Sequence, residues 1–350
     1  MKVVSYSLGN MEKELWACLE DEAQHLSAFQ TYSWAEALNS VGTEPRFVIA
    51  IDNKKPLLGL ALFRSSLISK TFSGYEAIGP LLCVSHIDAS AICHFFSALK
   101  RILKGASALY FYWNPFPYLN LDDVVLSQGF LPIPSATFVV DLSPSIESLW
   151  KNLEGRARRS ISRAERKGIE VVESEKWREW KEFYDLYVRV CHSKSMRPRS
   201  IDLHKSVYNY LATKGKARLF LAKYRGEIVG GIIFLVTPHE MMGYEGVSDV
   251  RFLKLSSNSA VHWHAISWAK DHGIKNYDFG GALWKLDKKH YLYGIQLFKR
   301  QWGGKLRKYN SYALNKLYFI GRTLPLRSSK IRRLYYAMEN LRVIKRSDRI

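Results

Sequence analysis

Apolar and polar positions follow the same pattern in two blocks of the chain. Residues 46–63 are RFVIAIDNKKPLLGLALF and residues 218–235 are RLFLAKYRGEIVGGIIFL, which align without a gap at an offset of 172 residues. In each block an apolar run, a short polar turn and a second apolar run predict a β-hairpin. Gly59 and Gly231 fall at equivalent positions, and a glycine inside a strand marks a bulge or a close backbone approach.

The elements around the two hairpins also repeat. A helical region precedes each hairpin, at 34–41 and 177–190, and a strand follows it, YEAIGPLL in one block and MMGYEGVS in the other. Next come helices predicted over 88–104 and 257–272, then the strands ALYFYW and NYDFGG. Each of these two helices has apolar residues at helical spacing: Ile92, Phe95, Phe96 and Leu99 in the first, Val261, Ala265, Trp268 and Ala269 in the second.

This shared order favours a duplication over a chance resemblance between two hairpins. It predicts an α/β fold in which mixed β-sheets are covered by helices, and it matches the acyltransferase fold of the GNAT class twice in tandem. We therefore expect a first GNAT-like domain over residues 1–145, a second over 146–320, and a basic helical tail over 321–350.

The second domain is expected to begin with a basic linker helix. Residues 149–169, LWKNLEGRARRSISRAERKGI, place an apolar stripe among arginines. Such a helix either has a solvated polar face or faces an anionic substrate.

Charge indicates the class of partner. The chain has 52 Lys and Arg against 32 Asp and Glu, a formal charge of +20, so anionic partners are expected. Residues 300–350 hold 14 basic and 2 acidic residues, which form either a solvated tail or a docking surface for RNA or anionic lipid.

Several classes of protein are excluded. The longest apolar runs are too short to span a bilayer and the N-terminus has no signal-peptide pattern, so we expect a cytoplasmic protein with peripheral contact to the inner face of the membrane. Four scattered cysteines rule out a disulfide framework or a zinc ribbon. The motifs of serine hydrolases, P-loop proteins and zinc proteases are absent, so no metal site is expected.

The segment NYDFGG and the later GIQLFKRQWGG carry the candidate chemistry. Asp278 falls at a predicted strand end, and Lys299 lies between Phe298 and Trp302, where an ammonium group can stabilise the oxyanion of an acyl transfer. Alternatively, Asp278 caps a turn and Lys299 extends from a buried stem to solvent. No glycine occurs between Ser248 and Ile266, where an ordinary GNAT enzyme cradles the coenzyme A pyrophosphate, and this argues against coenzyme A as the donor.

Several of these segments resemble the FemAB family of tandem-GNAT transferases, in its compact form without a coiled-coil arm. RARRSISRAERKGIEV is similar to the family's basic signature, FQTYSWAEAL to its first-helix opening, and Gly79–Pro80 to the glycine–proline after its third strand. YDFGG and the later FK are its most specific marks. The chain departs from the peptidoglycan branch in two ways: no lysine follows Trp34 on the first helix, and Asn114 replaces a frequent aspartate.

The resemblance implies an aminoacyl or acyl transferase that acts on a cell-envelope precursor, either a peptidoglycan stem peptide or an exopolysaccharide-type acceptor. Lys299 would stabilise the tetrahedral intermediate, Phe298 would hold it in position, and Asp278 would orient groups. Arg197 would bind the diphosphate of a nucleotide-sugar acceptor, and the further substrate-binding candidates are Arg158, Tyr244 and Asn114.

The implied partners are an aminoacyl-tRNA or acyl-thioester donor, a phosphorylated envelope precursor and an anionic membrane surface, with no cofactor of the enzyme's own. Two alternatives stay open: a coenzyme A-dependent N-acyltransferase, and a non-catalytic basic protein that binds RNA or membranes.

Overall fold

The structure is a computed structural model of the 350-residue chain, and it describes residues 1–66, 73–84, 87–103, 107–114, 116, 120–194, 196–285, 288 and 292–314. The predicted basic tail over 321–350 therefore lies outside the described residues. In the part of the chain that is described, no helix is long and apolar enough to cross a membrane.

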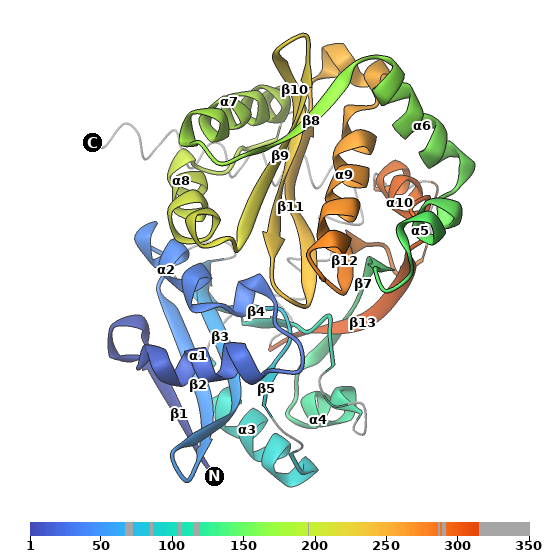
Figure 1. Ribbon diagram of the computed structural model, residues 1–350. Helices are drawn as coiled ribbons and strands as arrows, with labels where there is room; N and C mark the ends of the chain where they lie inside the picture. The colour runs from blue at the N-terminus through green and yellow to red at the C-terminus, as the bar shows by residue number, and fades with distance from the viewer. Residues whose placement is uncertain are drawn as a thin grey trace.

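Strands and helices alternate along the chain (Figure 1). The strands are β1 (Lys2–Ser7), β2 (Pro45–Asp52), β3 (Lys55–Ser66), β4 (Ser73–Ile78), β5 (Leu82–Cys83), β6 (Ala108–Tyr110), β7 (Leu131–Asp141), β8 (Ile169–Ser174), β9 (Ala217–Tyr224), β10 (Glu227–Val236), β11 (Glu240–Ser248), β12 (Asn276–Ala282) and β13 (Lys305–Ala313). The helices are α1 (Lys13–Glu22), α2 (Tyr32–Ser40), α3 (Ala89–Ile102), α4 (Leu121–Ser127), α5 (Ile146–Asn152), α6 (Gly155–Arg166), α7 (Trp177–Ser193), α8 (Ile201–Tyr210), α9 (Ser257–Asp271) and α10 (Tyr293–Arg300).

The predicted duplication is visible in the strands. Equivalent strands of the two hairpins begin 172 residues apart. β2 begins at Pro45 and β9 at Ala217, and β3 begins at Lys55 and β10 at Glu227. In each half the later strands pair in parallel, β4 with β6 and β11 with β12. The expected mixed α/β fold with the tandem GNAT order is confirmed.

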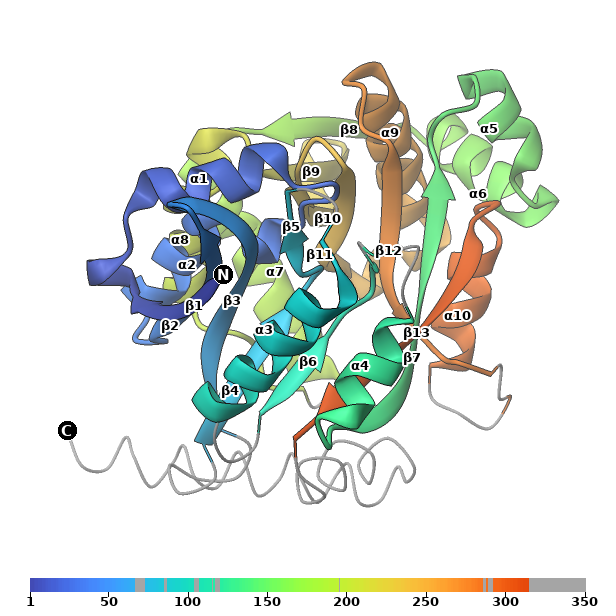
Figure 2. The same ribbon diagram turned by 90° about the horizontal axis from the view of Figure 1, so that it is seen from below.

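The two halves share one sheet by exchanging a strand. The strand order is β1-β2-β3-β4-β6-β13-β7-β12-β11-β10-β9-β8, with β5 paired to β3. β7 follows the first half in sequence but pairs with β12, and β13 follows the second half but pairs with β6. β7 and β13 also pair with each other along nine residues, and Figure 2 shows them side by side. The division at residues 145 and 146 stays a prediction, because the sheet itself is continuous across it.

Helices cover both faces of this sheet. On one face α1 and α2 of the first half and α7 and α8 of the second enclose a single apolar core. On the other face α3 and α4 cover the first half, while α5, α6 and α9 cover the second. The apolar positions predicted for these two helices are buried at Ile92, Phe95, Phe96 and Leu99 in α3 and at Val261, Ala265 and Ala269 in α9, while Trp268 is partly buried.

Both repeated glycines allow a helix to approach the sheet closely. A Cβ atom on Gly59 would lie 2.5 Å from Leu19 of α1, and one on Gly231 would lie 3.1 Å from Phe183 of α7. The predicted close approach is therefore confirmed at both strands.

The basic linker differs from its prediction, because it forms two helices and not one. α5 ends at Asn152, and α6 begins at Gly155 after the backbone at Leu153 and Glu154 turns to extended angles. The Arg158 guanidinium donates to the carbonyl of Lys151 at 2.9 Å, so it caps the end of α5. The break leaves the last carbonyls of α5 without intrahelical donors, and Arg158 of the next helix supplies donors to them.

Candidate active site

The centre of the candidate site is the point where β11 and β12 stop pairing. Their parallel ladder joins Glu240–Met242 to Asn276–Asp278, and β12 then continues through Gly280 against β7. Gly280 has a φ of 73°, which favours glycine, and the register of β12 with β7 shifts between Asp278 and Gly281. At the segment DFGG, β12 therefore loses its pairing with β11 and stays paired with β7 alone.

Asp278 is buried at this point, with only 2% of its surface exposed. Its Oδ1 accepts hydrogen bonds from the Thr137 hydroxyl on β7 and, at 2.7 Å, from the Gly280 amide. Burial raises the pKa of this carboxyl to about 6, and the nearby Glu240 adds to the rise. Near neutral pH, Asp278 is therefore an ionised carboxylate that can still accept a proton.

Lys299 approaches the same backbone from α10. Its Nζ donates to the carbonyl oxygens of Gly280 and Gly281, at 2.9 Å and 2.7 Å. Burial lowers the pKa of this lysine to about 8, although Asp278 opposes the shift. A desolvated ammonium fixed by two carbonyls has one N–H left for a third acceptor, which is the arrangement needed to stabilise an oxyanion.

Phe298 holds the C-terminal end of α10 in position. Its ring packs against Trp302 and against His262, whose imidazole is buried and contacts the Tyr277 hydroxyl at 2.6 Å. Burial lowers the pKa of His262 to about 3, so this histidine stays neutral.

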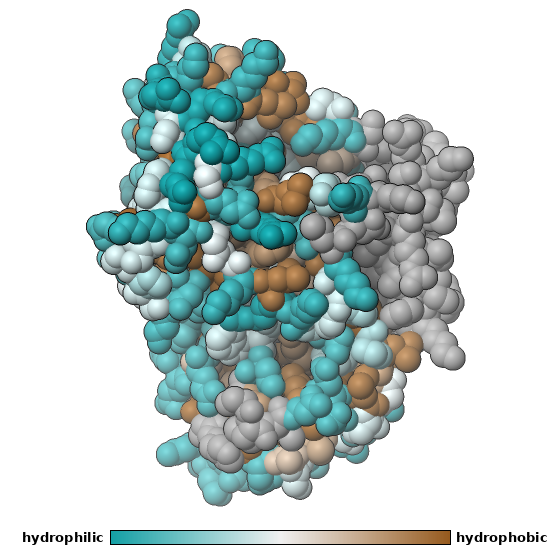
Figure 3. All heavy atoms as spheres, turned by 90° about the vertical axis from the view of Figure 1, so that its right-hand side faces the viewer, coloured by the Kyte–Doolittle hydropathy of each residue, from teal (hydrophilic) through white to brown (hydrophobic). Residues whose placement is uncertain are grey.

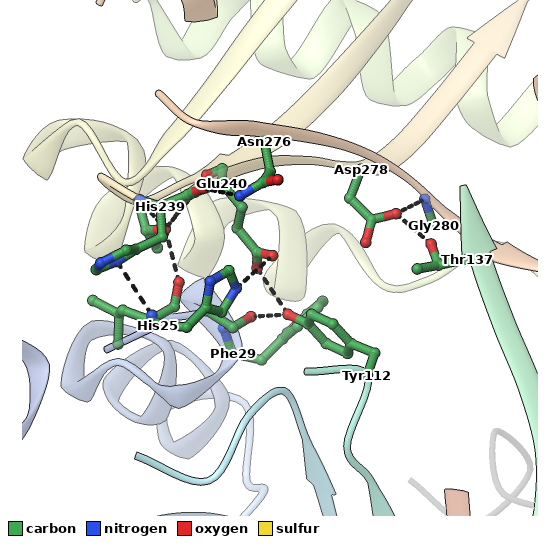
Figure 4. A network of polar contacts seen from close by, with 12 residues as sticks. His25, Phe29, Tyr112, Thr137, His239, Glu240, Asn276, Asp278 and Gly280 are labelled. Carbon is green, nitrogen blue, oxygen red and sulfur yellow. Dashed lines mark hydrogen bonds and ion pairs between the residues drawn. The ribbon is translucent and has the colours of Figure 1, made fainter. Parts of the chain in front are cut away.

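A second buried polar group lies behind Asp278. Figure 4 shows Glu240 at the start of β11 between His25 and Tyr112. The Glu240 carboxylate lies 3.2 Å from the His25 imidazole and accepts from the Tyr112 hydroxyl at 2.8 Å, and the same hydroxyl contacts the Ser27 hydroxyl. These residues come from the segment after α1, from the end of β6 and from β11, so the network joins the two halves of the chain. Burial and the neighbouring Glu240 raise the pKa of Tyr112, which remains a phenol.

Tyr244 lies further along β11, at a bulge in its pairing with β10. The guanidinium of Arg199 is 4.6 Å from the centre of its ring, and Trp34 of α2 contacts the ring edge-on. Arg199 precedes α8, where the buried His204 imidazole lies 2.5 Å from the Glu245 carboxylate. The structure therefore brings Tyr244 together with Arg199.

The remaining predicted residues are more dispersed. Arg197 is exposed two residues before Arg199, and Arg158 caps α5 on the opposite flank. Asn114 lines a cavity of about 500 Å³ next to β13, while its side-chain oxygen accepts from the Phe116 amide at 2.8 Å.

Sequence reasoning missed Thr137, Glu240, Tyr112, His25 and Arg307. Each lies in a segment with no motif of its own, and only the tertiary packing brings it to the site. A polar residue inside an otherwise apolar run, such as Thr137 in SATFVVD, was the one available signal. Over the described residues, no three His, Cys, Asp or Glu side chains gather as a metal site.

Comparison with known proteins identifies relatives of the chain. The acetyltransferase (GNAT) domain family matches residues 152–291. The aminoacyltransferase FemA of Staphylococcus aureus is 19% identical over 391 residues, covering 86% of this chain and 93% of FemA. A lipid II:glycine glycyltransferase of Staphylococcus haemolyticus is 27% identical over 103 residues, which span 29% of this chain and 25% of that relative's length.

Two solved structures show the same fold. The crystal structure of FemX superposes with a TM-score of 0.71 at 17% identity, covering 90% of this chain and 97% of FemX. L-PGS from Bacillus licheniformis superposes with a TM-score of 0.58 at 14% identity, covering 89% of this chain and 95% of that one.

Proposed function

The chain is a FemAB-like protein of the tandem GNAT fold, and we propose that it transfers an aminoacyl or acyl group to a cell-envelope precursor. The acceptor would be an amine or hydroxyl on a peptidoglycan-type or exopolysaccharide-type molecule. FemA and the glycyltransferase, both named as aminoacyl or glycyl transferases, support this class of reaction.

The position of the Lys299 ammonium, beside the DFGG segment, is the observation on which the proposal rests. When the acceptor nitrogen attacks the donor carbonyl, a C–N bond forms and negative charge develops on the carbonyl oxygen. The desolvated ammonium of Lys299, held by two glycine carbonyls, meets that charge with its remaining N–H. Because the charge is larger in the transition state than in the ester, this contact lowers the barrier.

Asp278 supplies a place for the proton. In the part of the chain that is described, Oδ1 of Asp278 accepts two hydrogen bonds and Oδ2 accepts none. The acceptor amine can lose its proton to Oδ2 as the C–N bond forms. The donor C–O or C–S bond then breaks, and the leaving group takes up a proton.

The surface of α6 supports a polyanionic donor such as aminoacyl-tRNA. Arg156, Arg159, Arg163 and Arg166 are all exposed on this helix, while Ala157, Ile161 and Ala164 are buried beneath them. The flank of the molecule that carries α5, α6 and α10 is mostly hydrophilic, with separate apolar residues between (Figure 3). Four cations on one rigid helix attract an RNA backbone more strongly than they attract a small thioester.

Tyr244 with Arg199 and the neighbouring Arg197 are proposed to contact the acceptor. The Arg199 guanidinium lies beside the Tyr244 ring, and arginine forms forked hydrogen bonds to phosphate. This arrangement suits a phosphorylated precursor, so these residues mark the acceptor side of the proposed site.

Replacing Lys299 tests the proposal. Transfer from charged tRNA or from an acyl-thioester to a lipid-linked or nucleotide-linked precursor should fall about 10²- to 10³-fold in Lys299→Met, since one oxyanion donor is removed. Arg300→Gln, an exposed neighbour on the same helix, is the matched control and should keep wild-type turnover. Unchanged turnover in folded Lys299→Met would remove this lysine from the mechanism.

A further inference from the structure

Arg307 of β13 lies in the same row of side chains as the candidate catalytic carboxylate. In the β7–β13 ladder it is paired with Thr137, and Thr137 is also paired with Gly281 of β12. Directly paired residues project to the same face of a sheet, so Arg307 and Thr137 share one face. The Thr137 hydroxyl donates to Asp278, so only strand β7 separates Arg307 on β13 from that carboxylate on β12.

The Arg307 guanidinium is held in place by a stack of planar groups. It lies 4.3 Å from the centre of the Trp113 ring, and the His25 imidazole is stacked 4.3 Å from the same ring at an interplanar angle of 11°. Both groups therefore contact the same indole. His25 is fixed in turn by Glu240, which anchors the whole stack to β11.

Among the described residues, this guanidinium has neither a hydrogen-bond acceptor nor a carboxylate at ion-pair distance. It is nevertheless half-buried, and burial lowers the pKa of Arg307 despite the opposing fields of Asp278 and Glu240. Arginine stays charged at neutral pH, so the protein holds a partly desolvated cation with five unused donors. A bound anion would offset the cost of partly burying this charge.

Two cavities meet at Arg307. One, of about 500 Å³, is lined by Tyr112, Trp113, Asn114 and Lys308; the other, of about 570 Å³, is lined by Asn152, Trp302 and Lys305. The acids in their walls are already engaged, since Asp122 accepts from Asn310 and Tyr312, and Asp141 accepts from the Ser143 amide. Lys305 and Lys308 line these cavities beside Arg307, and their charges favour an anion.

We propose that Arg307 binds an oxyanion of a substrate, a carboxylate or a phosphate, through forked hydrogen bonds at the junction of the two cavities. The planar guanidinium, fixed by Trp113, matches the two oxygens of such a group. That the oxyanion belongs to a transferase substrate rests on the proposed function, whereas anion binding at Arg307 does not.

Anion binding by the full chain tests this directly. Inorganic pyrophosphate and acetate serve as separate probes of the phosphate and carboxylate sources, and the dissociation constants are measured by calorimetry and by tryptophan fluorescence. Arg307→Met should weaken binding of the preferred anion about 10- to 100-fold, the value expected for hydrogen bonds to a charged group. Arg307→Lys should recover only part of the loss, because an ammonium cannot form the fork.

Lys254→Met is the matched control. Lys254 is an exposed cation that lines neither of the two cavities. This variant should bind within about twofold of wild type, as expected for an exposed charge. If the wild type binds neither anion, or if Arg307→Met binds as tightly as wild type, the proposal is wrong.

The outcome is separable from that of the proposed function. Lys299→Met should bind the anion normally and lose only transfer. Anion binding that depends on Arg307 in a chain without transferase activity would refute the transferase and keep the anion site. Transfer with an unchanged KM for both substrates in Arg307→Met would keep the transferase and show that the oxyanion bound at Arg307 does not belong to a substrate.

Discussion

Burial of the Asp278 carboxylate, which the proposed reaction needs, lowers the stability of the folded protein at neutral pH. Its folded pKa of about 6 exceeds the value of about 3.9 expected in an unfolded chain. Between these values the folded protein keeps a proton on Asp278 that the unfolded chain has released, so the contribution of Asp278 to stability falls as pH rises from about 4 to 6 and stays lower above 6.

Asp278→Asn should relieve this penalty, because the amide stays neutral and its oxygen can still accept from Thr137 and Gly280. At pH 7.5 we expect its free energy of unfolding to exceed that of wild type by up to about 3 kcal/mol, and near pH 4 the two should agree. Urea unfolding at both pH values measures the difference. A variant less stable than wild type at pH 7.5 would show that the carboxylate is stabilising.

The paired shifts of Asp278 and Lys299 also predict a pH profile for transfer. Activity needs Asp278 ionised and Lys299 protonated, so kcat/KM should rise through about pH 6 and fall through about pH 8. Lys299→Arg should lose the alkaline fall, since arginine does not titrate there. A flat profile from pH 5 to pH 9 would contradict the assignment of both groups.

At the scale of elements, α6 can be tested apart from the reacting centre. Replacing Arg156, Arg159, Arg163 and Arg166 by Gln should leave the helix folded, because its buried face is untouched. We expect weaker tRNA binding and a shallower salt dependence, by about 0.7–0.9 in log–log slope for each phosphate group that the variant no longer neutralises. Filter binding across a salt series measures both.

The control for α6 is an equally exposed helix. Arg178 and Lys181 on α7 each form an ion pair with the acid four residues on, so Gln at both positions should leave tRNA binding unchanged. Equal effects from both helices would mean that net charge alone attracts the RNA.

Gly231 tests the contact of α7 with the sheet. A Cβ atom there would lie 3.0 Å from the Phe220 carbonyl and 3.1 Å from the Phe183 ring, so Gly231→Ala should destabilise the protein by about 1–3 kcal/mol. Gly294 has open space around its Cα, and Gly294→Ala in α10 should be neutral or stabilising by up to about 1 kcal/mol. Chemical denaturation compares the two, and equal stabilities would contradict the close packing.

At the scale of the whole molecule, the exchange of β7 and β13 couples the two halves. Each half lacks its own last strand, and a single apolar core runs beneath α1, α2, α7 and α8. We expect one cooperative unfolding transition, coincident by calorimetry and by tryptophan fluorescence, although the chain has the length of two domains. Two separate transitions would show that the halves fold independently.

The sequence by itself determined the repeated elements and the candidate reacting pair. Apolar periodicity, turn residues and the two strand glycines act locally, so β2–β3, β9–β10, α3 and α9 could be predicted from short windows. Asp278 and Lys299 could be singled out because each lies in a distinctive segment, YDFGG and FKRQWGG.

Only the tertiary structure decided which strands exchange and what surrounds the candidate pair. Alternation within β7 and β13 encodes which side chains face a core but not which open edge each strand will join. The break between α5 and α6, Thr137 beside Asp278, and the stack of Arg307, Trp113 and His25 all follow from contacts between segments distant in sequence. Such contacts form where the packed sheet leaves an edge or a face open. Which edges and faces are open depends on how the whole chain packs, so no short segment of sequence determines it.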